Sequence, residues 1–149
     1  MWEVIYALGR IAVPIVFIVF GVIQFMNIGN YIANPAVVQV STLTGGVLSP
    51  TVIAYLVAAI DLVGGLLVLI GFMTRWAAVV LFVFVGLTIF FVHHFWDMEG
   101  AARALNQAHA LKNLAIMGAL LMLAAMGPGR WSVDNRNSAA GAGSQSSRA

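Results

Sequence analysis

Long apolar stretches dominate the chain, and their lengths predict four membrane-spanning helices. An α-helix rises about 1.5 Å per residue and the hydrocarbon core of a bilayer is about 30 Å thick, so a span needs about 20 mostly apolar residues. Four segments meet this requirement: Val4 to Met26, Thr51 to Phe72, Arg75 to Phe95 and Ala108 to Met126. The pattern therefore predicts an all-α membrane protein built as a bundle of four transmembrane helices.

The connections between these segments differ in length and character. Only Met73 and Thr74 separate the second and third spans, so these two spans are predicted to form an antiparallel hairpin. The first connection is longer, and its turn-forming pairs Asn34-Pro35 and Gly45-Gly46 flank the stretch from Ala36 to Leu43. We expect that stretch to form a short interfacial helix between the first two spans.

The composition supports a membrane location and removes several kinds of chemistry. Hydrophobic residues make up 62% of the chain and charged residues 8%, compared with roughly 25% charged residues in a soluble domain. The chain has no cysteine, which excludes disulfides, thiolate catalysis and cysteine-ligated metal centres. Its seven Lys and Arg residues form no cationic run, so we expect no nucleic-acid partner. The bilayer is the predicted environment.

Residues 1–134 are predicted to form a single transmembrane domain. After Asp134 the sequence consists of Asn, Ser, Ala, Gly and Gln with two arginines, a composition that cannot bury a hydrophobic core. We therefore expect residues 135–149 to be a disordered cytoplasmic tail. The cytoplasmic assignment follows from the rule that loops rich in Lys and Arg stay inside. With both termini inside, the inner side holds Arg75, Arg130, Arg136 and Arg148, and the first outer loop has no cation.

Two charged residues fall within the predicted spans, where a charge is costly unless it faces the protein interior and has a partner. Arg10 lies in the first span, on a face shared with Gly21 and Gln24, and Asp61 lies near the middle of the second span. An ion pair between Arg10 and Asp61 is geometrically possible. Three interpretations are open. The pair serves only to fix the register of the two helices, or Asp61 is a functional carboxylate that handles protons or quinol, or Arg10 and Asp61 do not pair.

A second polar group is predicted near the outer face. His93 ends the third span, while His109, Lys112 and Asn113 begin the fourth, and Asp97 is spaced so that it could orient His93. These residues are interfacial histidines with a snorkelling lysine, or they hold a polar ligand such as a quinone headgroup. In the second case His93 and Lys112 would both donate hydrogen bonds. Metal or haem ligation is a third possibility, but no metal site is assigned because no His-x-x-x-His pair is present.

Several short motifs occur together along the chain. They are Asp61-Leu62-Val63-Gly64-Gly65-Leu66-Leu67, Gly71, Thr74-Arg75, Ala77-Ala78, Lys112-Asn113-Leu114-Ala115-Ile116 and Gly127-Pro128-Gly129-Arg130-Trp131-Ser132-Val133-Asp134. In this order they resemble the DoxX family of small bacterial membrane proteins, and the likeness covers nearly everything up to Asp134. The family usually has Glu at the position of Asp61 and often has Lys close to Gln24.

This resemblance implies a four-span protein of the bacterial inner membrane that is associated with a quinone-linked oxidoreductase or an oxidative-stress system. Quinone is then the implied cofactor, and other membrane subunits or further copies of the chain are the implied partners. The alternative is a non-catalytic scaffold or assembly subunit of a larger membrane complex. A small transporter is disfavoured because the four spans contain no broken helix and no inverted repeat.

Overall fold

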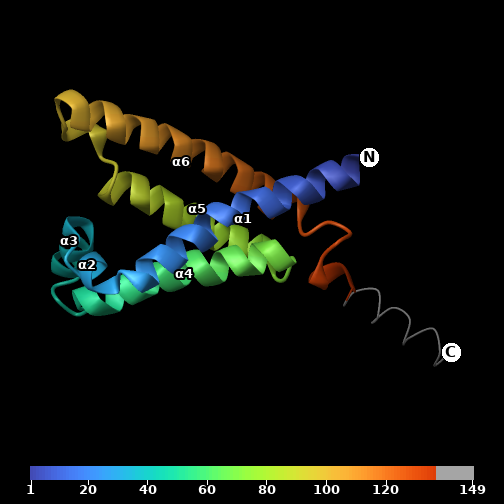
Figure 1. The fold of residues 1–149 in the computed structure, drawn as a ribbon, viewed down its shortest axis with the longest axis horizontal. Coiled ribbons are helices and arrows are strands. Elements are labelled where there is room, and N and C mark those ends of the chain that lie inside the picture. The colour runs from blue at the N-terminus through green and yellow to red at the C-terminus, as the bar shows by residue number, and fades with distance from the viewer. Residues whose placement is uncertain (137–149) are drawn as a thin grey trace.

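The computed structural model describes residues 1–136, and helices account for most of them (Figure 1). The elements are α1 (Trp2–Met26), α2 (Ile28–Ile32), α3 (Pro35–Leu43), α4 (Pro50–Ile70), α5 (Thr74–Phe91), the short 3-10 helix η1 (Phe95–Asp97) and α6 (Gly100–Met126). Among the described residues, α1, α4, the segment from α5 through η1, and α6 are long and apolar enough to cross a membrane. The predicted four-span all-α fold is confirmed.

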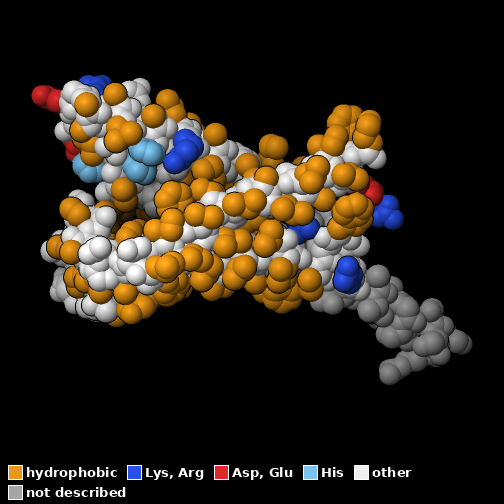
Figure 2. All heavy atoms as spheres, viewed as in Figure 1, with side chains coloured by type: hydrophobic (Ala, Val, Ile, Leu, Met, Phe, Trp, Pro, Cys, Tyr) orange, Lys and Arg blue, Asp and Glu red, His pale blue; other side chains and the backbone are white. Residues whose placement is uncertain are grey.

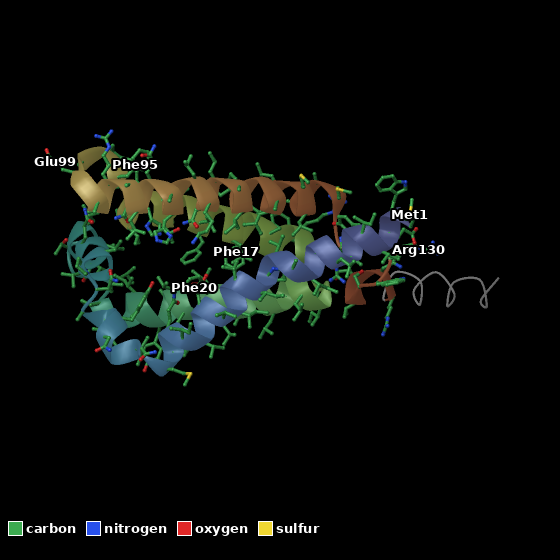
Figure 3. The ribbon with its side chains drawn as sticks, turned by 45° about the horizontal axis from the view of Figure 1, so that its top comes forward. Met1, Phe17, Phe20, Phe95, Glu99 and Arg130 are labelled. Atoms are coloured by element: carbon green, nitrogen blue, oxygen red, sulfur yellow. The ribbon has the colours of Figure 1, made fainter. Side chains whose placement is uncertain are left out.

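The four long helices are arranged as two pairs. Helix α1 packs along α4, α5 packs along α6, and the tight turn between α4 and α5 joins the pairs. Figure 1 shows the pairs meeting near the N-terminus and diverging toward α2 and α3. The end that carries Met1 and Arg130 is called the arginine end, and the end that carries Phe95 and Glu99 is called the histidine end (Figure 3).

Local sequence signals explain where the helices start and stop. The Asn34 and Ser49 side chains accept hydrogen bonds from the backbone N–H groups of Ala36 and Val52, and a proline follows each of these caps at the first helical position. The helix predicted over residues 36–43 is present as α3. Helix α4 ends at Gly71, which has a φ of 75°.

The hydrophobic core occupies only the half of the bundle nearer the arginine end. Its buried residues come from all four long helices: Phe17, Val68, Ala77, Ala78, Leu81, Val85, Leu120 and Leu123. A smaller cluster forms where α3 packs on α4, around Val37, Ile53 and Ala54. Toward the histidine end, α5 has no buried residue after Val85, and α6 has none between Ala110 and Leu120. The two pairs are therefore packed together at one end and separated at the other.

Residues 127–136 form a C-terminal strap across the arginine end. The Asp134 carboxylate accepts hydrogen bonds from the backbone N–H groups of Met73 (3.0 Å) and Thr74 (3.3 Å), and its own N–H donates to the Gly71 carbonyl. The Tyr6 hydroxyl donates to the Gly127 carbonyl. The strap therefore joins α1, α4 and α5.

The boundary of the predicted tail also changes. Asn135 and Arg136 were predicted to belong to the tail, but they continue a helical turn over residues 133–136. The Asn135 side chain donates to the Arg130 carbonyl, and its backbone N–H donates to the Ser132 hydroxyl. The rest of the predicted tail, residues 137–149, lies outside the described residues.

Candidate functional site

Arg10 is buried, with 4% of its surface exposed, but it does not contact Asp61. Its Nη1 donates hydrogen bonds to the carbonyls of Val68 (3.1 Å) and Leu69 (2.9 Å), and its Nη2 donates to the carbonyl of Trp131 (2.7 Å). The last carbonyls of a helix have no partner within the helix and carry partial negative charge. Arg10 therefore caps the C-terminus of α4 and holds the C-terminal strap against it.

Asp61 takes a different partner. It is 4% exposed, and its Oδ2 accepts a hydrogen bond of 3.0 Å from Nε2 of Gln24 on α1. Between residues 1 and 136, the two ion pairs within 4.0 Å are Glu3–Arg130 and His94–Asp97. The predicted Arg10–Asp61 pair is thus wrong. Antiparallel packing places Gly21 of α1 against Leu62 of α4, so it is Gln24, one turn farther along α1, that lies level with Asp61.

The second predicted group assembles at the histidine end. The rings of His93 and His109 stack, with centroids 5.0 Å apart and an angle of 21° between their planes. Nδ1 of His93 lies 3.0 Å from Oδ1 of Asn106, and Nζ of Lys112 lies 3.3 Å from Nδ1 of His109. These four residues, His93, Asn106, His109 and Lys112, are called the histidine cluster. It joins the end of α5 to the first half of α6.

Two details of this region differ from expectation. Asp97 pairs with His94 and not with His93, because η1 turns the chain so that Asp97 folds back onto its neighbour three positions earlier. Asn113 lies one turn deeper than His109, and its Nδ2 donates to the Thr88 hydroxyl at 3.3 Å. Asn113 therefore ties α6 to α5 below the cluster.

Sequence analysis missed Asn106, which orients His93. The spacing of residues 106, 109 and 113 places them on one face of a helix, so this face was a signal that could have been read. The predicted fourth span starts at Ala108, which leaves Asn106 in a connection. The structure begins α6 at Gly100.

The hydrogen bonds of the histidine cluster assign different roles to its two rings. A carbonyl oxygen accepts, so Nδ1 of His93 carries the proton that it donates to Asn106, and Nε2 of a neutral His93 is left as an acceptor. Lys112 donates to Nδ1 of His109, so the proton of a neutral His109 lies on Nε2. His93 was expected to donate a hydrogen bond to a ligand. In the structure Nε2 of a neutral His93 would instead accept one, and Nε2–H of a neutral His109 would donate one.

The cluster lies beside the opening between the two helix pairs. Figure 2 shows the histidines next to a hollow at this end of the molecule. At the same end of the molecule a pocket of about 210 Å³ lies between α3 and the end of α5, lined by residues that include Gln39, Phe91 and His94 but none of the histidine cluster. On α1, Phe17 and Phe20 are turned toward the other helix pair (Figure 3), and Phe20 is 48% exposed. Polar groups at the mouth thus adjoin an apolar interior.

This arrangement suits a molecule with a polar head and an apolar body. The histidine cluster offers hydrogen-bond donors, one acceptor and a flat aromatic surface, and no carboxylate of the described part of the chain is hydrogen-bonded to these side chains. Within residues 1–136, no group of three or more His, Asp or Glu side chains is placed to hold a metal ion. The chemistry available is hydrogen bonding and proton exchange at the imidazoles and the ammonium group.

Comparisons with known proteins place the chain among membrane proteins. The family model for DoxX matches residues 5–94. The chain is 36% identical over 134 residues to "Inner membrane protein YphA" of Escherichia coli K12, covering 89% of this chain and 90% of that protein. It is 33% identical over 126 residues to "Inner membrane protein YqjF" of the same organism, covering 85% and 86%. No solved structure matches. With four helices able to span a bilayer and these relatives, the chain belongs to the DoxX family of membrane proteins.

Proposed function

We propose that this protein is a quinone-binding membrane subunit of a quinone-linked oxidoreductase system, and that the histidine cluster holds the quinone headgroup. The observation that carries the proposal is the stacked pair His93–His109, with Lys112 beside it, at the mouth of the opening between the helix pairs. A quinone has two carbonyl acceptors on a flat ring, and its reduced form has two hydroxyl donors. The cluster offers partners for both forms.

The role of each residue follows from the ring tautomers. The Nε2–H of His109 and the ammonium of Lys112 would donate to a quinone carbonyl, whereas Nε2 of His93 would accept from a quinol hydroxyl. When bound, the quinone supplies the two-electron chemistry that no residue of this chain provides. The apolar side of the opening, with exposed Phe20, is where the hydrocarbon tail of the ligand would reach the bilayer.

The source of electrons is then a partner protein. The chain has no cysteine to ligate an iron–sulfur cluster or to form a redox disulfide. We propose that it works with other membrane subunits or as a homo-oligomer in the bacterial inner membrane, in line with the names of the E. coli relatives. The oxidoreductase subunit would donate or receive the electrons.

The first prediction concerns ligand retention. Removing the side chain of His93 or Lys112 by substitution with alanine should lower the combined quinone and quinol content of the purified protein about five-fold each, since one lost hydrogen bond is worth about 1 kcal/mol. Gln107→Ala is the matched control, because Gln107 is exposed on the same helix, α6, and does not belong to the cluster. Quinone is extracted after purification in a mild detergent and measured per mole of protein, with circular dichroism to confirm helicity.

The outcomes of that measurement decide between two functions. Unchanged quinone content in both variants, or no quinone in the unmodified protein, would favour a scaffold or assembly subunit. One observation supports that second candidate: Arg10 and Arg75 each bind the terminal carbonyls of a neighbouring helix, so these cations serve the fold.

The orientation in the membrane is the second prediction. We propose that the arginine end faces the cytoplasm, because it holds Arg75, Arg130 and Arg136, while the cations of the histidine end are offset by Asp97 and Glu99. Both termini would then be cytoplasmic. A periplasm-active reporter fused after residue 134 should give no signal, whereas the same reporter inserted between residues 45 and 46 should be active. The reverse result would overturn the orientation.

A further inference from the structure

A second buried polar group lies between α1, α2 and α4, and the proposed function does not use it. It consists of Asp61, Gln24 and Tyr31, and is called the Asp61 cluster. Nε2 of Gln24 lies 3.0 Å from Oδ2 of Asp61 and 3.3 Å from the Tyr31 hydroxyl oxygen. Gln24 is 9% exposed, and its other polar atom, Oε1, is buried without a hydrogen-bond partner. A buried acceptor without a partner is rare and calls for an explanation.

Within residues 1–136, no Lys or Arg side chain pairs with Asp61. Its neighbours on α1 and α2 are the neutral groups of Gln24 and Tyr31, and α3 contains no charged residue. The one charged residue of α5, Arg75, is bound to the carbonyls of Ala124 and Ala125 at the arginine end. Lys112 belongs to the α5–α6 pair, and its ammonium group donates to His109 on the same helix. The negative charge available at Asp61 is therefore not balanced by the fold itself.

The geometry points to a small monovalent cation, a proton or an alkali metal ion, as the ligand of the Asp61 cluster. Rotation of the Gln24 amide by a half turn would exchange its nitrogen and oxygen, and Oε1 would then face Asp61. In that arrangement a proton on Asp61 would be donated to Oε1, and Nε2 would take the buried position where Oε1 now has no partner. An alkali ion would instead be bound by oxygens of Asp61, Gln24 and Tyr31, which are the atoms that hard cations prefer.

The position of Tyr31 provides the route. Helix α2 lies at the end of α1 nearer the histidine end, and Tyr31 is half-buried there, which makes it the least buried member of the cluster. Burial and, next, the nearby Asp61 carboxyl raise the pKa of the Tyr31 hydroxyl, so it stays neutral: its oxygen can bind an alkali ion and its O–H can pass on a proton. Entry would thus be from the histidine end.

The test measures thermal unfolding of the full chain in mild detergent. One series varies pH without alkali ions, using choline chloride as the salt, and the other varies NaCl at fixed pH with ionic strength held constant. A ligand that binds the folded state raises its stability with concentration. We expect the melting temperature of the unmodified protein to rise, by about 3 °C or more per hundred-fold concentration change, in one of the two series.

Asp61→Asn, which keeps the shape but cannot carry the negative charge, should remove that response. Glu99→Gln is the control for an exposed carboxyl outside the cluster and should leave it intact. A response to pH alone identifies a proton, and a response to NaCl identifies an alkali ion. Equal responses in the unmodified protein and Asp61→Asn, or none in either, would overturn the inference.

A second variant, at Gln24, keeps the inference testable if Asp61→Asn does not fold. Gln24→Met keeps the Asp61 carboxyl but removes the amide oxygen, so it should lower the response at least two-fold. An unchanged response in Gln24→Met would also overturn the inference. Because the measurement needs no quinone, its failure is independent of the outcome for the histidine cluster.

Discussion

Gly21→Ala should push α1 away from α4 and destabilise the protein by about 2–3 kcal/mol, the cost of overpacking a tight contact. A Cβ atom at Gly21 would lie 2.7 Å from the backbone nitrogen of Leu62 and 2.9 Å from its Cα. Backbone atoms of a helix cannot move aside as the end of a flexible side chain can. The two helices would have to separate along the contact that also brings Gln24 to Asp61.

Gly9→Ala is the matched control on the same helix, because a Cβ there would meet no atom within 4 Å. Alanine is a better helix former than glycine, so this control should be neutral or slightly stabilising. Both variants are compared by thermal unfolding in the same detergent. Equal stability of the two would show that α1 and α4 do not pack as closely as the structure has them.

Arg10→Lys should also be strongly destabilising, by roughly 3 kcal/mol, although it keeps the positive charge. The guanidinium serves the carbonyls of Val68, Leu69 and Trp131 from two nitrogens in a fixed plane. An ammonium group is compact and lacks this fork, so it leaves buried carbonyls without a donor. The loss is measured as the free energy of unfolding in denaturant or as the shift in melting temperature.

Arg130→Lys is the control for this change, because Arg130 makes an exposed ion pair with Glu3 at 3.1 Å and should cost less than about 1 kcal/mol. If Arg10→Lys and Arg130→Lys have the same small effect, Arg10 does not cap α4. If Arg10→Lys is tolerated only at low ionic strength, a diffuse electrostatic role would replace the specific hydrogen bonds.

The spans and the hairpin could be predicted from sequence because bilayer thickness fixes the length of an apolar helix. The short helix after Asn34-Pro35 could be predicted because a cap and a proline mark its start. Helix α2 has no comparable signal, since its N-cap Asn27 makes no side-chain capping bond and the helix contains five residues. Helices this short depend on tertiary contacts.

The partners of Arg10 and Asp61 could not be predicted in the same way. Charge complementarity favours an ion pair, but the register of two antiparallel helices decides which residues meet. That register is set by the close approach of Gly21 to Leu62 and of Gly65 to Phe17 and Ile18. The glycines on these faces were visible in the sequence, whereas the axial offset between the helices was not.

The histidine cluster was predicted in part. His93, His109 and Lys112 lie together as expected from antiparallel packing, because each falls near the same end of its helix. The role of each ring depends on hydrogen bonds to Asn106 and Lys112, and these depend on side-chain directions that spacing alone does not give.

The C-terminal strap has a consequence for biogenesis. A membrane protein is inserted as it is synthesised, so α1 and α4 are in the bilayer before residues 127–136 have been made. Until then Arg10 lacks its Trp131 partner, and the start of α5 lacks the Asp134 cap. Of the described chain, the segment that leaves the ribosome last is therefore the one that completes the bonding of the first helix. A protein truncated before this segment would keep four helices that can insert. Its arginine end would lack the strap, so the side chain of Arg10 and the start of α5 would be more accessible to proteases.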